Sequence, residues 1–490
     1  MTETHESQAT ATYDVVVLGA GPVGQNVTDR ARAAGLTVAV VERELVGGEC
    51  SYWACVPSKA LLRPVVAVAD ARRVDGARQA VTGPLDNARV FARRDHYVTD
   101  WDDAGQAQWV KSIGADLFRG HGRLNGPRRV TVTVTGDGDG DGDDGDGYTL
   151  TARHAVAVAT GSRPVVPDLP GIQQARPWTN RQGTDSSTVP GRLAIVGGGG
   201  VGAEMATLWQ GLGAQVTLLA RRLLPRMEPF AGELLADSLT RSGADVRIGR
   251  YVTSLHRPDA TGPVTLTLDD GSEVEADEVM FATGRAPGTD DIGLETVGLT
   301  PGSWLDVDTT CLVRGVDGEW LYALGDVNHR ALLTHQGKYQ ARTAGDAIGV
   351  RAAGLPLDNA PWGDHATTAD QYAVPQVFFT DPEAAGVGLT ARQAILAGHR
   401  IKTVDIDFNA AQGADLYADN YRGHARMVVD LDRETLLGMT FVGPGVSELL
   451  HSATVAVAGQ VPLGRLRHAV ACFPTISEIW LVLLNAYQRD

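Results

Sequence analysis

The chain has 490 residues, more than one hydrophobic core supports, so about three or four domains are expected. Hydrophobic residues make up 43% of it, and the formal net charge of −16 argues against nucleic acid or an anionic membrane surface as a partner. Residues 1–12 lack the basic-then-apolar pattern of a signal peptide, and no apolar run approaches the ~20 residues of a membrane span. These features predict a cytoplasmic protein.

The first predicted elements form a βαβ unit. Its parts follow in chain order: a strand over Tyr13–Leu18, the turn Gly19–Gly24, a helix to Ala34, and a strand over Thr37–Val41 that Glu42 closes. Glycines with GxGxxG spacing let the backbone approach a pyrophosphate at the helix N-terminus, and the acid accepts hydrogen bonds from a ribose. Gly19, Gly21, Gly24 and Glu42 are therefore predicted to bind a dinucleotide without a 2′-phosphate.

Two of the chain's four cysteines, Cys50 and Cys55, lie between a glycine pair and Pro57. Positions five apart in an ideal helix are ~7.5 Å apart along its axis, whereas a disulfide needs Cα atoms within ~7 Å of each other. The pair can therefore close only if the first helical turn is distorted. A closable dithiol at a helix N-terminus, where the dipole favours a thiolate, predicts a redox centre. Two buried, reduced cysteines that never meet are the alternative.

An acidic, glycine-rich segment interrupts the next part of the chain. Between the strand-like segments Arg129–Val134 and Tyr148–Ala152, residues 136–147 are almost purely Asp and Gly, which predicts a disordered hairpin loop. Calcium binding is the alternative, but an EF-hand register from Asp137 puts Tyr148 where the bidentate glutamate belongs. The isolated positions of the other two cysteines give no zinc pattern, so no metal site is predicted.

The strand–turn–helix–strand order recurs further along, at Leu193–Val196, Gly197–Gly202, Ala203–Gln210 and Val216–Leu219. The position that corresponds to Glu42 is Ala220, and Arg221 and Arg222 follow it. A carboxylate there would repel a 2′-phosphate, whereas arginine binds one bidentately. This unit is therefore predicted to bind NADPH in preference to NADH. Gly202 argues the other way, since alanine often replaces the third glycine in NADPH-binding units; a solvated strand end is the alternative for the arginines.

The remaining segments suggest crossings between domains and a different C-terminal part. The turns Ala159–Pro164 and Ala282–Pro287 each follow an apolar strand, and Trp320–Val327 is predicted as a strand that carries Gly325 and Asp326 near its end. After about Ala366 an antiparallel sheet is predicted, with strands at Val374–Phe379, Arg426–Asp430 and Leu437–Val442 and helices at Arg392–Ala397 and Val446–Ala458.

These segments carry a family resemblance. Gly47–Lys59 resembles the redox-active segment of the class I pyridine nucleotide–disulfide oxidoreductases, which include dihydrolipoamide dehydrogenase, glutathione reductase, mycothione reductase and mercuric reductase. Further landmarks stand in family order: Gly19–Gly24, both Ala-Thr-Gly crossings, Gly325-Asp326, Leu333-Thr334-His335, Phe379–Glu383 and Gly443-Pro444. The resemblance implies an α/β fold with two Rossmann-like dinucleotide-binding domains and a C-terminal α+β dimerisation domain. The expected boundaries are 1–165 (FAD), 166–286 (NAD(P)H), 287–366 (central) and 367–490 (dimerisation), in a homodimer.

The resemblance also implies roles for single residues. Cys55 would be the thiolate next to the flavin, and Cys50 the thiol that attacks the substrate. Lys59 would be the cation near the flavin, with Glu204 as its ion-pair partner. A plain structural ion pair is the alternative for Lys59 and Glu204. The residues expected to bind FAD are Gly19, Gly21, Gly24, Glu42, Gly48, Gly122, Thr160, Gly161, Arg285, Gly325 and Asp326. Those expected to bind NADPH are Gly197, Gly199, Gly202, Arg221, Arg222 and Gly284.

One segment departs from the family pattern. Disulfide-reducing members carry His-Pro-Thr-x-x-x-Glu near the C-terminus, whose histidine is the general acid–base in the partner subunit's site, but here Phe473 stands at the histidine position and Glu478 lacks its usual partner. Phenylalanine cannot transfer a proton, so a contribution of roughly 10²–10⁴-fold is absent. His468 is a possible substitute, and Cys472 is either an extra thiol or, as preferred, a packed small residue.

The sequence therefore predicts an FAD-dependent oxidoreductase that passes electrons from NADPH through a Cys50–Cys55 disulfide to an unidentified small molecule. Tyr52 and Trp53 replace the smaller residues usual between the cysteines and, with Phe473, would line an apolar cavity, with Trp53 packed against its own domain. A quinone or similar acceptor reduced at the flavin is the first alternative. A redox-sensing or partner-binding flavoprotein with little turnover is the second.

Overall fold

The computed structural model describes residues 9–134 and 147–489. The chain divides into two compact units. The first unit consists of Met1–Val56, Val98–Arg163 and Arg285–Gln371, and the second of Pro57–Tyr97, Pro164–Gly284 and Tyr372–Asp490. The four domains expected from the sequence stay a prediction.

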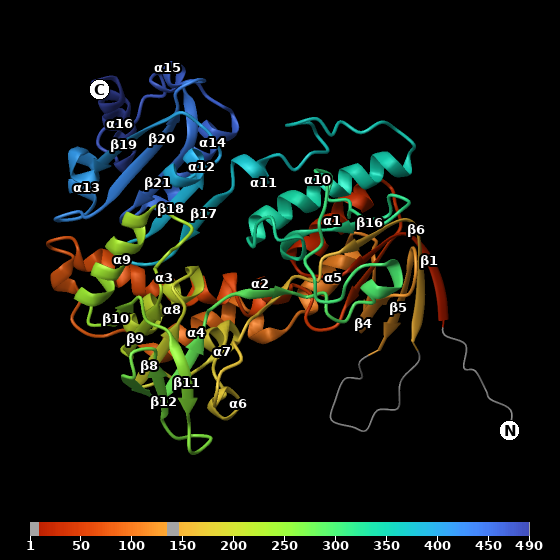
Figure 1. Ribbon diagram of the computed structural model, residues 1–490, viewed down its shortest axis with the longest axis horizontal. Helices are drawn as coiled ribbons and strands as arrows, with labels where there is room; N and C mark the ends of the chain where they lie inside the picture. Colours follow the sequence, from red (N-terminus) through yellow and green to blue (C-terminus); the bar gives the residue numbers. More distant parts are fainter. Residues whose placement is uncertain (1–8, 135–146, 490) are drawn as a thin grey trace. The chain divides into compact units, whose positions relative to one another are not determined.

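The first unit is built on a seven-stranded sheet in the order β3-β2-β1-β6-β5-β4, with β16 beside β6 (Figure 1). Its strands are β1 (Ala9–Leu18), β2 (Val38–Glu42), β3 (Asp116–Arg119), β4 (His121–Leu124), β5 (Arg129–Thr133), β6 (Tyr148–Val158) and β16 (Leu321–Ala323). The β1, β2, β3, β6 and β16 neighbours pair in parallel. The end of β1, Val15–Leu18, is fully buried and wholly apolar, as expected for a parallel strand covered on both faces.

Helices flank this sheet, and α1 follows its first βα turn. They are α1 (Pro22–Ala33), α2 (Gly48–Tyr52), the start of α3 (Cys55–Arg72), α5 (Ala104–Ser112), α10 (Thr334–Ala352) and α11 (Ala369–Tyr372). The short strands β7 (Ser162–Pro164) and β15 (Arg285–Pro287) pair with each other. Gly345 of α10 lies so close to Arg30 of α1 that a Cβ there would be 2.5 Å from the arginine Cβ, so these helices pack tightly.

The strands predicted in this unit are present, two of them with different extents, whereas β3, β4, β7 and β15 were not predicted from the sequence. The predicted strand Tyr148–Ala152 and the apolar strand expected before the Ala159–Pro164 turn form one continuous strand, β6. Its antiparallel pairing with β5 confirms the hairpin, and residues 136–146 of the loop lie outside the described residues. The strand predicted over Trp320–Val327 is wrong in its second half. It ends at Ala323 because Gly325 has φ +73°, which an extended strand excludes, and Gly325–Asn328 form a 3₁₀ turn.

The second unit contains three sheets. A four-stranded parallel sheet has the order β10-β9-β8-β14, a three-stranded antiparallel sheet the order β11-β12-β13, and a five-stranded antiparallel sheet the order β17-β18-β21-β20-β19. The strands are β8 (Arg192–Val196), β9 (Gln215–Ala220), β10 (Asp245–Ile248), β11 (Val252–His256), β12 (Val264–Leu268), β13 (Glu273–Ala276), β14 (Glu278–Phe281), β17 (Pro375–Phe378), β18 (Ala384–Gly388), β19 (Ile401–Asp407), β20 (His424–Asp430) and β21 (Thr435–Val442). The predicted C-terminal antiparallel sheet is therefore confirmed.

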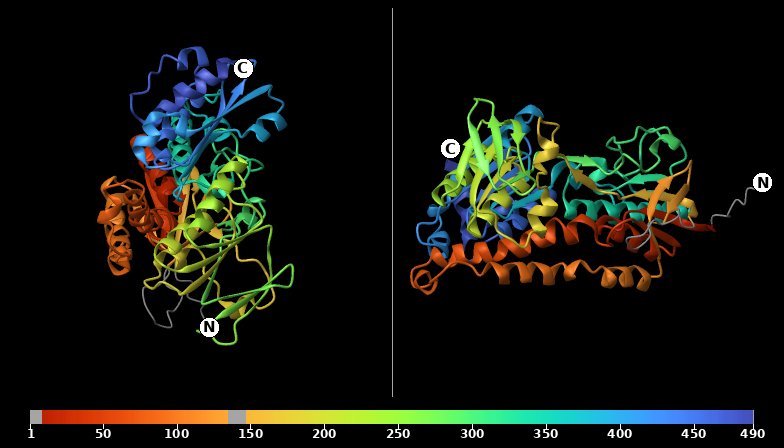
Figure 2. Two further views of the ribbon diagram at one scale, coloured as in Figure 1. Left: turned by 90° about the vertical axis from the view of Figure 1, so that its left-hand side faces the viewer. Right: turned by 90° about the horizontal axis from the view of Figure 1, so that it is seen from below.

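The helices of the second unit pack on these sheets. They are most of α3, then α4 (Asn87–Tyr97), α6 (Ile172–Ala175), α7 (Asn180–Asp185), α8 (Gly200–Gly211), α9 (Pro229–Arg241), α12 (Ala391–Leu396), α13 (Gln412–Tyr417), α14 (Val446–Ala458), α15 (Leu463–Leu466) and α16 (Ile479–Arg489). The long helices α3 and α4 run side by side (Figure 2), and Leu61 and Phe91 from them join one core with Trp209 of α8. Trp209 is fully buried, so the parallel sheet's helical cover is a packed core rather than a solvated face.

Candidate active site

The first βα turn is shaped for a phosphate. Gly19 has φ +96°, and a Cβ on Gly24 would lie 1.8 Å from the carbonyl oxygen of Gly19, so both positions require glycine. Gly21 caps α1 without a side-chain hydrogen bond, and a Cβ there would meet nothing within 4 Å. The N-terminus of a 12-residue helix is thus left open, which is the arrangement that binds a pyrophosphate.

Glu42 lies at the end of β2 and holds this turn. Its Oε2 accepts the Ala20 N–H at 2.7 Å and its Oε1 accepts the Glu44 N–H at 2.9 Å. Burial raises the pKa of Glu42. Each carboxylate oxygen keeps a lone pair, so ribose binding by Glu42 stays a prediction that this geometry permits.

A second polar group surrounds Asp326 at the start of the 3₁₀ turn. The Ser162 hydroxyl donates to Asp326, and Arg285 donates from Nε to the Ser162 Oγ and from Nη2 to the Ser162 carbonyl, both at 2.6 Å. Burial raises the pKa of Asp326. Nearby, the Thr160 Oγ1 is buried and finds no hydrogen-bond partner within the described residues, and Gly161 has open space around its Cα. An orphaned hydroxyl beside an open glycine fits a bound polar cofactor.

The other glycines expected near FAD have distinct surroundings. A Cβ on Gly48, which has φ +57°, would lie 3.1 Å from the Cα of Gly21, so the start of α2 lies against the open phosphate turn. Gly122, in β4, lies instead against Leu18 and Val41, where a Cβ would be 2.8 and 2.9 Å from their side chains. Close strand packing therefore accounts for the glycine at position 122.

The two cysteines lie on either side of a break in the helix. Cys50 is in α2, Trp53 ends that helix with φ −136°, and α3 begins at Cys55. The distortion that the sequence required is confirmed. Both cysteines are thiols and half-buried, and their sulfurs share a hydrogen bond, which excludes the alternative that they never meet.

The thiol pair lies at the N-terminus of α10, which has 19 residues. The Thr334 Oγ1, in the first turn of that helix, is 3.3 Å from the Cys55 Sγ. The hydrogen bond with Cys55 and burial raise the pKa of Cys50, and they outweigh the opposing effects of Thr334 and of Lys338 one helical turn further on. Cys50 therefore stays protonated at neutral pH, and the positive end of the helix dipole faces the pair.

The aromatic residues between the cysteines do not both line a cavity. Tyr52 is 1% exposed, its hydroxyl accepts from the Gln106 Nε2 at 2.9 Å, and its ring lies 5.8 Å from that of the half-buried Trp53. The expected contribution of Tyr52 to an apolar cavity is wrong, because the side chain is enclosed by its own unit.

In the second unit, Lys59 and Glu204 form an ion pair. The Lys59 Nζ is 2.7 Å from the Glu204 Oε2, and the Glu204 Oε1 accepts the Phe379 N–H at 3.1 Å. The Lys59 ammonium also lies 5.1 Å from the centre of the Phe379 ring. The Glu204 side chain is 8% exposed and that of Lys59 is 37% exposed, so a buried carboxylate holds a partly exposed ammonium group in place. Phe379 was a family landmark in the sequence, but nothing there indicated this contact.

The second βα turn repeats the first. A Cβ on Gly202 would lie 1.9 Å from the Gly197 carbonyl oxygen, while Gly199 caps α8 without a side chain and has nothing within 4 Å. Gly284, with φ +157°, is equally open. Arg221 and Arg222 follow β9 directly and are exposed, and no carboxylate within the described part of the chain pairs with either. The open helix N-terminus and the unpaired cations fit a nucleotide with an extra phosphate.

The C-terminal segment also lies in the second unit. Phe473 is 74% exposed, His468 and Cys472 are exposed, and the Glu478 Oε2 accepts the Gly413 N–H at 3.0 Å. The expectation that Cys472 is packed is wrong for this chain, since neighbouring elements leave it uncovered. Glu478 uses a backbone amide in place of a histidine.

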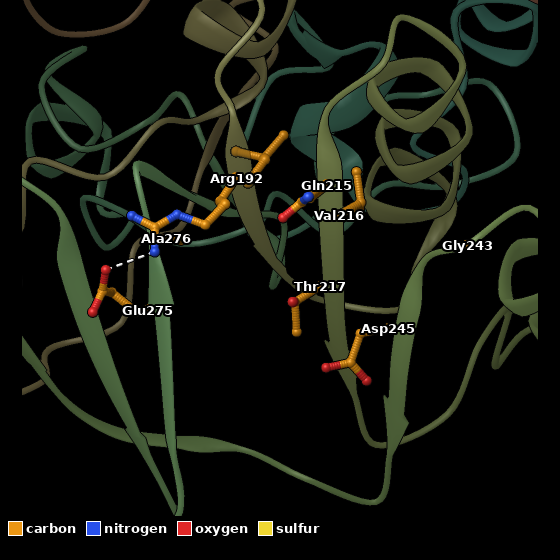
Figure 3. A pocket seen from close by; sticks show the side chains of 9 residues that line it. Arg192, Gln215, Val216, Thr217, Gly243, Asp245, Glu275 and Ala276 are labelled. Atoms are coloured by element: carbon orange, nitrogen blue, oxygen red, sulfur yellow. Dashed lines mark hydrogen bonds and ion pairs between the residues drawn. The ribbon is translucent and has the colours of Figure 1, made fainter.

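A polar cavity of about 330 Å³ lies elsewhere in the second unit (Figure 3). Its lining residues come from the amino-terminal edge of the parallel sheet and from β13 of the three-stranded sheet: Arg192, Leu193, Gln215, Val216, Thr217, Gly243, Asp245, Glu275 and Ala276. Arg192 is held by Glu275 at 2.6 Å and by Asp277 at 2.6 Å. The glycine turn is at the carboxyl ends of the same strands, so this cavity is not the predicted nucleotide site.

Two other kinds of feature are absent from the described residues. None of the helices placed between residues 9 and 489 is long and apolar enough to cross a membrane. Among the same residues, no group of three or more His, Cys, Asp or Glu side chains is arranged to hold a metal ion.

Taken together, two phosphate-shaped βα turns and a dithiol at a helix N-terminus define a dinucleotide-dependent oxidoreductase. Residues 13–346 match the family described as "Pyridine nucleotide-disulphide oxidoreductase", and residues 374–483 match its "dimerisation domain". The chain belongs to this family. It is accordingly an FAD-dependent enzyme that acts on sulfur groups and uses NAD(P)H.

Similar proteins agree with this assignment over nearly the whole length. "Dihydrolipoyl dehydrogenase 3" of Pseudomonas aeruginosa is 32% identical, covering 95% of this chain and 96% of its own, and "Mercuric reductase" of Staphylococcus aureus is 29% identical, covering 98% and 83%. Among solved structures, the HOCl-induced flavoprotein disulfide reductase RclA from Escherichia coli has a TM-score of 0.78 at 22% identity, covering 96% and 99%. LpdA from Mycobacterium tuberculosis has a TM-score of 0.79 at 24% identity, covering 98% and 99%, and both structures share the fold.

Proposed function

We propose that the chain transfers electrons from NADPH to a small-molecule acceptor through a Cys50–Cys55 disulfide, with lipoamide and glutathione disulfide as poor acceptors. The observation that carries the proposal is the contact between the two sulfurs at the N-terminus of α10, combined with phenylalanine at position 473. A dithiol that closes and opens needs this contact. Efficient interchange with an external disulfide needs, in addition, a group that moves protons.

The residues of the two βα turns would hold the dinucleotides. Gly19, Gly21 and Gly24 would hold the FAD pyrophosphate, and Gly197, Gly199 and Gly202 that of NADPH. When bound, FAD supplies the transfer of a hydride from nicotinamide and of two electrons onward to sulfur. Thr160 and Asp326 would offer their polar atoms to FAD, since the Thr160 hydroxyl has no hydrogen-bond partner among the described residues. Lys59 would place a positive charge near the flavin, fixed by Glu204.

The thiols and α10 control the charge of the reduced pair. Breaking the disulfide takes two electrons and one proton and gives one thiol and one thiolate. Cys50 keeps the proton, because burial and its hydrogen bond with Cys55 raise its pKa. The Thr334 hydroxyl and the helix N-terminus stabilise the negative charge on Cys55.

Phe473 limits the transfer of electrons from the dithiol to an external disulfide. Before Cys50 attacks an external disulfide its thiol must lose its proton to a base, and the departing sulfur then leaves as a thiolate that needs a proton. In the family pattern the residue at position 473 takes up the first proton and returns it to the departing thiolate, and phenylalanine can do neither. A quinone or similar acceptor reduced at the flavin avoids this step and is the second candidate, favoured by the same residue. Residues 374–483 match the dimerisation domain, which supports a homodimer with Phe473 at the partner's site.

Steady-state turnover with NADPH and three acceptors tests the proposal. Lipoamide and glutathione disulfide are expected to be reduced much more slowly than a quinone, by roughly the 10²–10⁴-fold that a general acid–base contributes. The variant His468→Ala is expected to change none of these rates. Fast reduction of either disulfide that persists in His468→Ala would contradict the argument from Phe473.

Two further measurements separate the alternatives. Anaerobic titration with NADPH is expected to reduce the protein by two electron pairs, one for FAD and one for the disulfide; a protein that neither pyridine nucleotide reduces would favour the redox-sensing role. The ratio of KM for NADH to that for NADPH is expected to exceed one and to fall when Arg221 and Arg222 are replaced by glutamine. An unchanged ratio would count against these arginines.

A cytoplasmic location is part of the same proposal.

A further inference from the structure

The edge of the parallel sheet that carries Arg221 also carries an exposed tyrosine. The adjacent strands β9 and β10 end together, since the Gly249 N–H donates to the Ala220 carbonyl at 2.8 Å. Arg221 follows β9 and Tyr251 follows β10 by three residues. The two side chains therefore project from neighbouring strand ends of the predicted NADPH-binding unit.

Tyr251 is rigidly mounted although its ring covers no core. Its backbone N–H donates to the Asp269 Oδ1 at 3.1 Å, and its carbonyl accepts the Asp269 N–H at 3.0 Å. The side chain is nevertheless 50% exposed. The Arg221 guanidinium carbon lies 5.9 Å from the ring centre, within the range of a cation–π contact. One ring thus presents a flat apolar face to solvent and keeps a cation beside it.

The charges around Tyr251 leave Arg221 and Arg222 available. Arg250, the residue before the tyrosine, is neutralised by Asp269 at 3.7 Å and Asp270 at 3.0 Å. Within the described residues, Arg221 and Arg222 have no such partner. The local excess of positive charge is therefore concentrated beside the ring, where a phosphate would be attracted.

The glycine turn is in contact with this segment. A Cβ on Gly198 would lie 2.1 Å from the carbonyl oxygen of Arg222, and the Gly198 carbonyl accepts the Leu224 N–H at 2.8 Å. A nucleotide whose pyrophosphate lies at the open N-terminus of α8 therefore has its adenosine half directed to the ends of β9 and β10. The glycine turn would then face the pyrophosphate, the arginines the 2′-phosphate, and the tyrosine the base.

We propose that Tyr251 is the surface on which the adenine of the nicotinamide nucleotide stacks, and that its ring positions Arg221 for the 2′-phosphate. This inference rests on the proposed use of NADPH and adds a residue that determines affinity. Aromatic rings bind any base through their faces, and removing one weakens binding roughly 5- to 100-fold per base. The loss should apply to phosphorylated and unphosphorylated nucleotides alike, whereas the loss of Arg221 should affect only the former.

Calorimetric titration of the holoenzyme, whose FAD site is filled, with 2′,5′-ADP and with 5′-ADP tests this. In Tyr251→Ala both ligands are expected to bind at least 5-fold more weakly, and in Tyr251→Phe both affinities are retained. Arg221→Gln is expected to weaken 2′,5′-ADP alone. In the double variant the two losses for 2′,5′-ADP should be less than additive, because Arg221 loses its position when the ring is gone.

Tyr97 provides a matched control. It is also 50% exposed and also carries a stacked arginine, Arg93, at 4.6 Å, but it lies on α4 rather than at the sheet edge. Tyr97→Ala should bind both ligands as the parent does. Unchanged affinities in Tyr251→Ala, or an equal loss in Tyr97→Ala, would overturn the inference. If the parent binds 2′,5′-ADP no more tightly than 5′-ADP, the NADPH preference fails, while the stacking is still judged by the 5′-ADP affinities.

Discussion

Removal of the Glu204 carboxylate should destabilise the holoenzyme by about 2–4 kcal/mol. In Glu204→Ala the partly buried Phe379 N–H loses its acceptor, which costs about 1–3 kcal/mol. Lys59 loses its ion pair, but its side chain is 37% exposed and can be rehydrated, so this part is discounted to about 1 kcal/mol. Glu204→Gln keeps an acceptor for Phe379 and should cost only about 1 kcal/mol.

Urea unfolding of the holoenzyme, followed by tryptophan fluorescence, measures these losses. A double-mutant cycle with Lys59→Met should return a coupling of about 1 kcal/mol between Lys59 and Glu204. The matched control is Asp237→Asn, which breaks the exposed pair of Asp237 with Arg241 in α9 and should change stability by less than about 0.5 kcal/mol. Additive losses for Lys59→Met and Glu204→Ala would refute the reasoning, since independent sites cannot be an ion pair.

Three further outcomes are expected. Cys50→Ser should retain a long-wavelength thiolate–flavin absorption band that Cys55→Ser abolishes, and the reverse result would exchange their roles. Asp103→Asn should lower the free energy of unfolding by about 1.5–3 kcal/mol, because Asp103 accepts the Val46 N–H at 2.6 Å. Burial raises the pKa of Asp103, but the Arg119 guanidinium and the bond to Val46 together hold this pKa below its usual value. The stability difference between parent and variant is therefore present above about pH 4 and is lost as the pH falls through the folded pKa, which urea midpoints measured between pH 3 and 7 check. Phe473→His should increase the rate of lipoamide reduction relative to quinone reduction; an unchanged ratio in steady-state assays would show that position 473 is remote from the chemistry.

The glycine turns and the cysteine pair could be found in the sequence because their requirements are local. Gly24 and Gly202 each contact a carbonyl five residues back in the same turn, so spacing alone identifies them. The break between Cys50 and Cys55 follows from helix geometry and the reach of a disulfide. The family landmarks then supplied cofactor class and order.

The contacts that complete the site could not be found in the same way. Thr334 reaches Cys55 across 279 positions, and nothing in the sequence pattern brings these residues together. Tyr52 was expected at a cavity, but Gln106, from a distant helix, bonds its hydroxyl and encloses it. The strand predicted through Gly325 failed because hydrophobic pattern carries no information on a positive φ.

The tight approach at Gly202 also constrains how this enzyme's coenzyme choice can evolve or be engineered. Exchanging the last glycine of such a fingerprint for alanine is one sequence difference between dinucleotide-binding units. Here the added methyl group would lie 1.9 Å from a carbonyl oxygen, so the helix would have to retreat from the strand before any nucleotide bound. Changes in coenzyme preference are therefore expected at the strand end, at Arg221 and Arg222, whose exposed side chains can be replaced without such a clash.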